Sequence, residues 1–389
     1  MMSVRADQQI VILSPSLFSR DAVGNASAEL YKTLASIPGY KVTLLTRGTN
    51  RSDVPAQLVT TLTDLMYNAS FLDADVVIYT YAIYSELFDI LQIGNGKAIQ
   101  IVRFHNVTPA NLVADCDRPL IERSMRQLHL FGSADEIWAD SQENVAELMR
   151  RGIGSERVQV MPLGVTPLFR GSILNKLPGP VRFIYVGRIV PAKGIDELVE
   201  AAGLLRRLGS FEFSVEVCGN LQQAPPGFLE DLEQRIFELD LSDVVLLRGG
   251  ISNAELADAY RDAHVFVTAS HHEGFCVPVI ESLAAGCVPV SYDNSNLRYI
   301  HGGLGKMAKV ASVQGLAEAM QSVGEALVRT WAGETVELDV SGGVLNFSSF
   351  AAAAAIYVDQ FNPNLRALKI KERLNVLTCR DKLVSAIEA

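Results

Sequence analysis

The chain has 389 residues, of which 49% are hydrophobic, and a formal net charge of −10 at pH 7. This length predicts two domains with sizeable cores, and the acidic balance argues against nucleic acid as the main partner. The five cysteines are scattered without CxxC spacing, which favours a reducing compartment over a disulfide framework or a zinc site. Because neither a signal peptide nor a run of 18 apolar residues is apparent, we expect a cytoplasmic protein, with room for peripheral contact at the inner membrane face.

Strand and helix patterns alternate along the first part of the chain. Short apolar runs predict strands at residues 10–13, 42–45, 75–79, 98–104, 136–139 and 158–162. Helical patterns lie at residues 26–35, 84–91, 119–131 and 143–150. This alternation predicts a parallel sheet that is covered on both faces. Ligands bind such sheets beyond the carboxyl ends of the strands.

Glycines and prolines at residues 171–180 break the pattern and predict a linker. Alternation then restarts, with strands predicted at residues 181–186, 213–218, 244–248, 264–268 and 287–292, and helices at 195–207, 227–239 and 253–263. Later helices are predicted at residues 313–329, capped by Ser312, and at 348–361 and 365–388, while 331–344 carry no clear pattern. We therefore predict an α/β protein with two Rossmann-like domains, residues 1–172 and 173–364, followed by a helical segment at 365–389.

Residues 269–286 carry the most informative pattern. They join two predicted strands through a turn at Gly274 and a helix whose first position suits Pro278. The first amides of such a helix lack intrahelical partners and attract anions, phosphate above all. Glu273 and Glu281 frame this helix start, and we expect these acids to accept hydrogen bonds from sugar hydroxyls. Because a nucleotide sugar carries both phosphate and hydroxyls, the pattern predicts a nucleotide-sugar site. The alternative interpretation is an ordinary strand–turn–helix in which Glu273 and Glu281 are two solvated acids.

Two cations, Arg188 and Lys193, lie in the loop between the predicted strand 181–186 and the next helix. A basic loop in this position can neutralise a diphosphate, with arginine as a fork and lysine as a point charge. Taken alone, the pair would more simply be two surface cations.

Both stretches resemble a known family. His-Glu-Gly-Phe-Cys-Val-Pro-Val-Ile-Glu-Ser-Leu-Ala-Ala-Gly at residues 272–286 looks like the Glu-x7-Glu motif of retaining glycosyltransferases of family 4. Tyr-Val-Gly-Arg-Ile-Val-Pro-Ala-Lys-Gly at residues 185–194 resembles the diphosphate-binding segment of that family. The resemblance implies the GT-B fold, in which two Rossmann-like domains with parallel sheets face a central cleft and a C-terminal helix crosses back onto the first domain. It also implies sugar transfer without a metal or another cofactor.

The resemblance implies a role for each matching residue. Arg188 and Lys193 would hold the leaving diphosphate, Glu273 would hold sugar hydroxyls, and Glu281 would hold the ribose. His105, directly after the strand 98–104, resembles the family histidine that contacts the donor sugar and completes a catalytic set with Arg188, Lys193 and Glu273. Further donor contacts are expected from Gly24, Gly187, Gly219, Gly249, Gly274, Phe275, Cys276 and Val277. Packing alone is an equally good account of the glycines at 219 and 249.

Several polar residues of the first domain have two interpretations. Asp21 is a candidate for acceptor binding or for helix capping, and Asn106 for acceptor binding or for orienting its loop. Asp140 and Ser141 are predicted to cap the helix at 143–150. Asp73-Ala-Asp75 matches the DxD metal motif superficially, but it precedes a strand at its amino end, which argues against a metal site.

The resemblance implies a nucleotide-sugar donor and a glycan or lipid-linked acceptor, in polysaccharide or lipopolysaccharide assembly. It leaves the sugar, the base and the acceptor open. A sugar-nucleotide epimerase of the same fold and a catalytically inactive nucleotide-sugar-binding protein are the alternatives. An NAD-dependent oxidoreductase would need G-x-G-x-x-G after an early strand. Residues 14–26 follow the first predicted strand and contain a single glycine, Gly24, which argues against this class.

Overall fold

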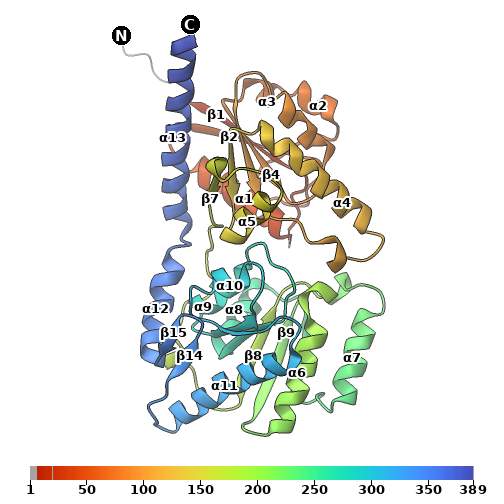
Figure 1. The fold of residues 1–389 in the computed structure, drawn as a ribbon, viewed down its shortest axis with the longest axis vertical. Helices are drawn as coiled ribbons and strands as arrows, with labels where there is room; N and C mark the ends of the chain where they lie inside the picture. Colours follow the sequence, from red (N-terminus) through yellow and green to blue (C-terminus); the bar gives the residue numbers. More distant parts are fainter. Residues whose placement is uncertain (1–6, 20, 389) are drawn as a thin grey trace. The chain divides into compact units, whose positions relative to one another are not determined.

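The structure is a computed structural model that describes residues 7–19 and 21–388, and for 380–388 only the backbone. The chain forms two compact units (Figure 1). Unit 1 is drawn from Met1–Gly164 and Phe361–Ala389, and unit 2 is Val165–Gln360. The chain thus passes into unit 2 after Gly164 and returns to unit 1 after Gln360.

Unit 1 contains a seven-stranded parallel sheet in the order β3-β2-β1-β4-β5-β6-β7. Its strands are β1 (Gln8–Ser14), β2 (Tyr40–Thr46), β3 (Gln57–Leu58), β4 (Val76–Tyr81), β5 (Ile99–Phe104), β6 (Glu136–Ala139) and β7 (Val158–Val160). Every residue of β4 is buried, as expected when helices cover both faces of a parallel sheet. The strand order reverses between β1 and β4, and the carboxyl ends of strands at such a reversal form the usual ligand site of the fold.

The helices of unit 1 partly follow the predicted pattern. They are α1 (Ala22–Ala35), α2 (Leu62–Met66), α3 (Ala69–Asp73), η1 (Glu86–Gln92), η2 (Ala110–Leu112), α4 (Arg118–Gln127), η3 (Leu128–Ser133), α5 (Gln142–Arg150), η4 (Ser155–Arg157) and α13 (Pro363–Glu388). The segment predicted as one helix at 119–131 is α4 followed by the 3₁₀ helix η3, and the segment at 84–91 is the 3₁₀ helix η1. No helix within 7–19 and 21–388 combines the length and apolarity that a bilayer crossing requires.

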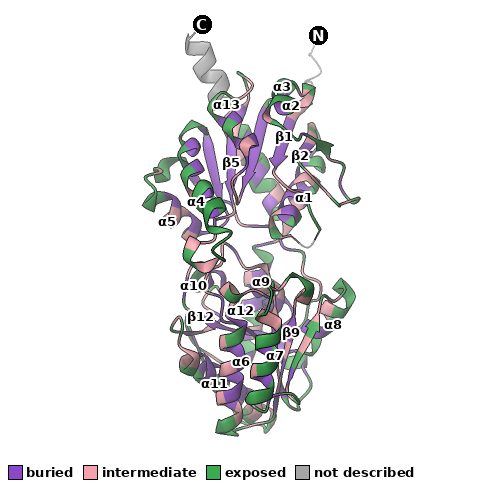
Figure 2. Cartoon of the chain, turned by 90° about the vertical axis from the view of Figure 1, so that its right-hand side faces the viewer, coloured by how far each residue is buried: buried purple, intermediate pink, exposed green. Residues whose placement is uncertain are grey.

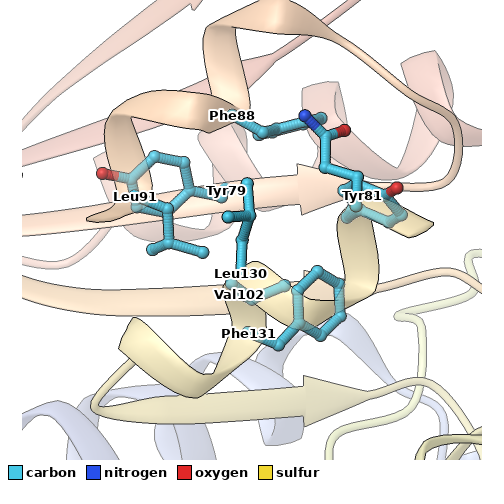
Figure 3. A pocket seen from close by; sticks show the side chains of 8 residues that line it. Tyr79, Tyr81, Phe88, Leu91, Val102, Leu130 and Phe131 are labelled. Carbon is cyan, nitrogen blue, oxygen red and sulfur yellow. The ribbon is translucent and has the colours of Figure 1, made fainter. Parts of the chain in front are cut away.

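Aromatic side chains fill the core of unit 1 between the sheet and the helices η1 and η3. Tyr79, Tyr81, Phe88 and Phe131 line one small pocket there, which Figure 3 shows from close by. The Tyr81 and Phe131 rings meet edge to face with centroids 5.0 Å apart, and the Tyr81 hydroxyl donates to the Ser124 carbonyl at 2.6 Å. This packing fixes the carboxyl end of β4, next to β5 and the residues that follow it.

Helix α13 completes the other face of unit 1, along which it runs in Figure 1. Three of its apolar side chains lie in the same buried core as residues of α1 and β1: Ile370, Leu374 and Leu377. Two arginines of α13 pair with acids of unit 1, Arg366 with Glu29 and Arg373 with Glu136. Glu136 is almost fully buried and also accepts from the indole of Trp138 at 2.7 Å. The last helix is therefore an integral part of the core of unit 1.

Unit 2 contains a six-stranded parallel sheet in the order β10-β9-β8-β11-β12-β13. Its strands are β8 (Val181–Val186), β9 (Phe213–Cys218), β10 (Val245–Gly249), β11 (Val265–Thr268), β12 (Val288–Tyr292) and β13 (Lys306–Ala308). Its helices are η5 (Ile173–Asn175), η6 (Pro191–Lys193), α6 (Ile195–Leu208), η7 (Leu221–Gln223), α7 (Phe228–Glu238), α8 (Asn253–Asp262), α9 (Val277–Ala284), α10 (Leu297–Ile300), α11 (Val313–Trp331) and α12 (Phe347–Asp359). Figure 2 shows its buried strands beneath helices with exposed outer faces. The strand order reverses between β8 and β11.

Two segments of unit 2 differ from their predicted form. Residues 171–180, predicted as a linker, include η5 and pack on unit 2, where the buried Lys176 ammonium donates to the Tyr260 carbonyl at 2.9 Å. Residues 331–344, which had no assignment, contribute most of an antiparallel hairpin of β14 (Leu338–Val340) and β15 (Gly343–Leu345). An ion pair of 2.6 Å between Lys306 and Asp339 joins this hairpin to β13.

Candidate functional site

The loops after β8 and β11 meet at the strand-order reversal of unit 2. Gly194 adopts a left-handed conformation with φ +60°, and a Cβ atom there would lie 2.3 Å from the Ala269 carbonyl oxygen. Only glycine fits so close an approach. The His271 amide also donates to the Ala192 carbonyl at 2.9 Å. These contacts hold residues 187–194 against residues 269–276.

Lys193 and Glu273, predicted to act together, form an ion pair with 2.6 Å between Nζ and Oε1. The Lys193 ammonium also donates to the His272 carbonyl at 3.2 Å and to the Ser270 hydroxyl at 3.4 Å. Both charged side chains remain partly exposed, at 13% and 15%. The pair is therefore held in a defined position from which it can still meet a ligand.

Arg188 lies at the start of the same loop, and its side chain is exposed. Its guanidinium makes no hydrogen bond or ion pair with the residues that the structure describes. Its backbone is fixed, because the hydroxyl of buried Tyr185 donates to the Arg188 carbonyl at 2.9 Å. The loop thus presents a cation that an anion can take up.

The start of helix α9 offers fewer amides than predicted. Pro278 occupies the second position of α9, not the first, and Cys276 precedes the helix with φ +74°. The Val279 amide donates to the Cys276 carbonyl at 3.1 Å, so it is already used. Among the described residues, the Cys276 and Val277 amides have no hydrogen-bond acceptor and remain available to an anion.

Glu281 lies on α9, and the hydroxyl of buried Tyr260 donates to its Oε2 at 3.1 Å. Burial raises the pKa of Glu281, while the hydrogen bond from Tyr260 counters part of that rise. Its other carboxylate oxygen has no hydrogen-bond partner among the described residues. This oxygen can accept a hydrogen bond from a hydroxyl.

Residues 294–296 brace this site, and sequence reasoning missed them. The contacts are Asn294 Nδ2 to the Ser270 carbonyl at 2.7 Å, the Glu273 amide to Ser295 Oγ at 2.9 Å, and Asn296 Nδ2 to the Phe275 carbonyl at 2.7 Å. The signal was present, because an Asn-Ser-Asn run begins two residues after the predicted strand at 287–292. Glu197 of α6 was missed as well; it lies 2.5 Å from His271 Nε2 and accepts from the Tyr292 hydroxyl.

The glycines at the carboxyl ends of β8, β9 and β10 pack against one another. The Gly187 amide donates to the Cys218 carbonyl at 3.0 Å, and the Gly219 amide to the Gly249 carbonyl at 3.1 Å. A Cβ atom at Gly219 would lie 2.2 Å from the Gly187 carbonyl oxygen. These contacts support the packing interpretation of the glycines at 219 and 249, while Gly274, Phe275 and Val277 lie in the loop and helix start described above.

Unit 1 carries a separate cluster around His105, which follows β5. His105 Nδ1 lies 2.6 Å from Asp140 Oδ2, and the other carboxylate oxygen accepts from Arg103 Nε at 3.2 Å and Nη2 at 3.1 Å. The side chains of Arg103, Asp140 and His105 are only 0%, 2% and 6% exposed. Burial alone would raise the pKa of Asp140, but His105 and Arg103 outweigh burial and lower this pKa.

Of the Asp140-Ser141 pair predicted to cap the helix at 143–150, only Ser141 does so. Ser141 caps α5 by accepting from the Asn144 amide at 3.2 Å, which leaves Asp140 to its partners in the cluster. Sequence reasoning identified His105 but missed Arg103, although an arginine within an otherwise apolar strand was a visible signal.

Asn106, Asp21 and Gly24 have structural partners. Buried Asn106 adopts φ +74°, donates to Asn144 Oδ1 at 2.9 Å and accepts from the Val107 amide at 2.7 Å, which supports its loop-orienting role. Asp21 caps α1 by accepting from the Gly24 amide at 2.7 Å.

A Cβ atom at Gly24 would lie 2.5 Å from the Phe18 carbonyl oxygen, so tight packing explains this glycine. Of the DxD residues, Asp73 ends α3, and Asp75 accepts from the Gln9 amide at 2.8 Å, at the amino end of the sheet.

The chain is similar to known glycosyltransferases. Residues 172–325 match the family described as "Glycosyl transferases group 1". The MMP alpha-(1->4)-mannosyltransferase of Mycolicibacterium hassiacum is 31% identical over 179 residues, which is 45% of this chain and 41% of that protein. The amylovoran biosynthesis glycosyltransferase AmsK of Erwinia amylovora is 28% identical over 237 residues, 58% of this chain and 55% of that protein. This chain thus spans about half the length of these curated relatives.

Among solved structures, Anabaena HepE in complex with UDP and glucose has a TM-score of 0.73 at 14% identity, over 95% of this chain and 100% of that one. The predicted α/β class with two Rossmann-like units is confirmed, and the fold is that of GT-B glycosyltransferase structures. The matching family and relatives support a glycosyltransferase.

Proposed function

We propose that this protein is a retaining, metal-independent glycosyltransferase of family 4. It would move a sugar from a nucleoside-diphosphate sugar to a hydroxyl of a glycan or lipid-linked acceptor. One observation carries the proposal: the Lys193–Glu273 ion pair lies where the loops after β8 and β11 meet. The loop of Lys193 also holds Arg188, whose guanidinium has no partner among the described residues. The site thus joins cations for a diphosphate with a carboxylate for sugar hydroxyls.

In the proposed reaction, Arg188, Lys193 and the amides at the start of α9 take up the charge of the departing diphosphate. Fixed charges aimed at a developing charge lower the barrier because they need no reorganisation. The bond from the sugar carbon to the phosphate oxygen breaks, and a bond to the acceptor oxygen forms on the same face. The acceptor proton moves to the departing phosphate oxygen, so no protein base is required.

Three other residues bind the donor in this proposal. Glu273 holds hydroxyls of the transferred sugar, and the unpaired oxygen of Glu281 accepts from the ribose. His105 of unit 1 contacts the transferred sugar. The names of the relatives support a role in polysaccharide or lipopolysaccharide assembly, and the UDP and glucose bound to HepE favour UDP-glucose as the first donor to try. The protein would act in the cytoplasm or at the inner membrane face, where such donors are made available.

A two-step experiment tests this function. First, UDP, GDP, ADP, dTDP and their sugars are compared for their effect on thermal unfolding, since a ligand that binds the folded state stabilises it. Second, the donor so identified is incubated with glycan and lipid-linked acceptors, and both the free nucleoside diphosphate and the glycosylated product are measured. We expect one base to stabilise the protein and product to form with retained anomeric configuration. Absence of stabilisation by every nucleotide, or binding without consumption, would contradict the proposal.

A further inference from the structure

The cluster in unit 1 leaves two buried polar atoms, Arg103 Nη1 and His105 Nε2, without a hydrogen-bond partner among the described residues. His105 Nε2 is buried and forms no hydrogen bond with the described residues, whereas Nδ1 of the same ring has a short contact of 2.6 Å to Asp140. A buried polar atom without a partner costs about 1–3 kcal/mol. Such an atom indicates that a group absent from the free chain completes the hydrogen bond.

The chemistry of Asp140 decides which ring nitrogen carries the proton. Arg103 donates two hydrogen bonds to one oxygen of Asp140 and faces it with a positive charge, so the carboxylate is ionised. An ionised carboxylate can only accept hydrogen bonds. The short contact to the other oxygen must therefore be donated by Nδ1–H of His105. In the neutral imidazole, Nε2 then carries the lone pair and acts as an acceptor.

We propose that Asp140 is a positioning residue that holds His105 in the Nδ1–H form, so that Nε2 accepts a hydrogen bond from a hydroxyl of the transferred sugar. This inference rests on the proposed function, because the hydroxyl belongs to the sugar donor. Without the Asp140 carboxylate, the His105 ring could rotate or change tautomer. The carboxylate fixes both the ring orientation and the proton, as outer partners of histidine commonly do.

Arg103 makes this arrangement sustainable inside the protein. An isolated buried carboxylate would be strongly destabilising, whereas a carboxylate paired with a fully buried, forked arginine is compensated. The guanidinium occupies one oxygen and leaves the second for His105. Arg103 also comes from β5, the strand that His105 directly follows, so one rigid element carries both partners of Asp140.

The test combines a tautomer measurement with kinetics. Long-range 1H–15N correlation spectra of the labelled full chain at pH 8 report which nitrogen of His105 is protonated, with the signal assigned from a His105→Gln variant. The variants are Asp140→Asn and a control, Glu136→Gln, which also removes a buried, arginine-paired carboxylate but at the amino end of β6, whereas His105 follows the carboxyl end of the neighbouring parallel strand β5. Turnover of UDP-glucose, or of the donor found in the thermal panel, and the affinity for the nucleoside diphosphate alone complete the measurements.

We expect Nδ1–H in the wild type and in Glu136→Gln, and a shift toward Nε2–H in Asp140→Asn. We expect kcat of Asp140→Asn to fall by about 10- to 100-fold, with the affinity for the nucleoside diphosphate unchanged because its proposed contacts lie in unit 2. An Nε2–H tautomer in the wild type would overturn the inference even if Asp140→Asn failed to fold. So would a kcat in Asp140→Asn within about twofold of that in Glu136→Gln. A wild type that consumes no nucleotide sugar would instead contradict the proposed function, while the tautomer still reports on Asp140.

Discussion

Cys276 adopts a backbone conformation that its residue type disfavours, at the start of α9. A left-handed conformation costs a residue with a Cβ atom roughly 1–2 kcal/mol, and a β-branched residue more. Replacing Cys276 with glycine removes this strain but loses a half-buried side chain and adds freedom to the unfolded chain. We therefore expect Cys276→Gly to change the free energy of unfolding by less than about 1 kcal/mol, and Cys276→Val to lower it by about 2 kcal/mol or more.

Urea unfolding measures both variants of Cys276. The control is Cys116→Val, at an exposed cysteine with negative φ, where we expect little change. Equal stability of Cys276→Val and the wild type would contradict the strained conformation.

Tyr260 is expected to affect nucleotide binding without touching the reacting atoms. Its hydroxyl donates to one oxygen of Glu281 and favours the ionised form. Tyr260→Phe removes this hydrogen bond, worth about 1 kcal/mol, and the pKa of Glu281 should rise further. We expect nucleotide affinity to weaken about fivefold near neutral pH. As the pH is lowered, the further loss of affinity should begin at a higher pH than in the wild type. We expect kcat to stay unchanged. Calorimetric titration across pH measures this effect, and an unaltered pH profile would show that Tyr260 does not act through Glu281.

Among the elements, helix α13 is the one whose partners lie farthest away in the sequence. Leu374 is fully buried in the core of unit 1, whereas Leu368 on the same helix is 58% exposed. Replacing a buried leucine with alanine typically costs 2–5 kcal/mol. We expect Leu374→Ala to destabilise unit 1 by about that amount and Leu368→Ala by less than about 0.5 kcal/mol. Chemical unfolding that is monitored through Trp138 compares them, and equal losses would mean that α13 does not contribute to this core.

The sequence predicted elements well where their pattern was local and strong. The β8 strand at 181–186 and the helix α6 agree with their predicted bounds to within one residue, because continuous apolar runs and helical spacing were unambiguous there. The β14–β15 hairpin was missed because three-residue strands around two glycines leave almost no periodicity. The helix predicted at 119–131 splits because its end tightens into a 3₁₀ turn over the aromatic core, a tertiary effect that no local pattern contains.

In the candidate site, too, local motifs were predictable from the sequence and contacts between distant segments were not. Lys193 and Glu273 were found through their motifs, and the structure brings their charges together. Asp140 was assigned to a cap because a polar pair before a helix usually caps it; only the register of β5 and β6 reveals that it faces Arg103 and His105. The two units are each described by their own contacts, so the predicted meeting of His105 with the residues of unit 2 stays a prediction.

At the scale of the whole molecule, the two units should respond differently to acid. Unit 2 contains His264 and His301, both fully buried. Burial lowers the pKa of each to about 4 from an ordinary value of 6.5, and in His264 the charge of Arg182 adds to this shift. Because the folded-state pKa lies below the unfolded value, their contribution to stability is complete above pH 6.5 and is lost as the pH falls from 6.5 toward 4.

The loss for His301 alone should reach on the order of 3 kcal/mol by pH 4. Urea unfolding at pH 7 and pH 4.5, followed through Trp331 in unit 2 and Trp138 in unit 1, separates the two responses. We expect His301→Gln to reduce the pH dependence of the Trp331 signal and leave that of Trp138 unchanged. An identical pH dependence in the variant and the wild type would show that His301 is not buried in its neutral form.

The central claim is that Arg188 and Lys193 recognise a diphosphate, and the affinity for a nucleoside diphosphate relative to its monophosphate tests it most directly. Calorimetry would compare the wild type, Arg188→Ala, Lys193→Ala and, as a control, Arg207→Ala at an exposed arginine of α6. A charge-assisted hydrogen bond contributes about 1.5–3 kcal/mol, so we predict at least about tenfold tighter binding of the diphosphate than of the monophosphate in the wild type and in Arg207→Ala. We predict a clearly smaller ratio in each of the other two variants, still above one because the second cation remains. Equal affinity for both nucleotides in the wild type, or an unchanged ratio in Arg188→Ala and Lys193→Ala, would contradict the account.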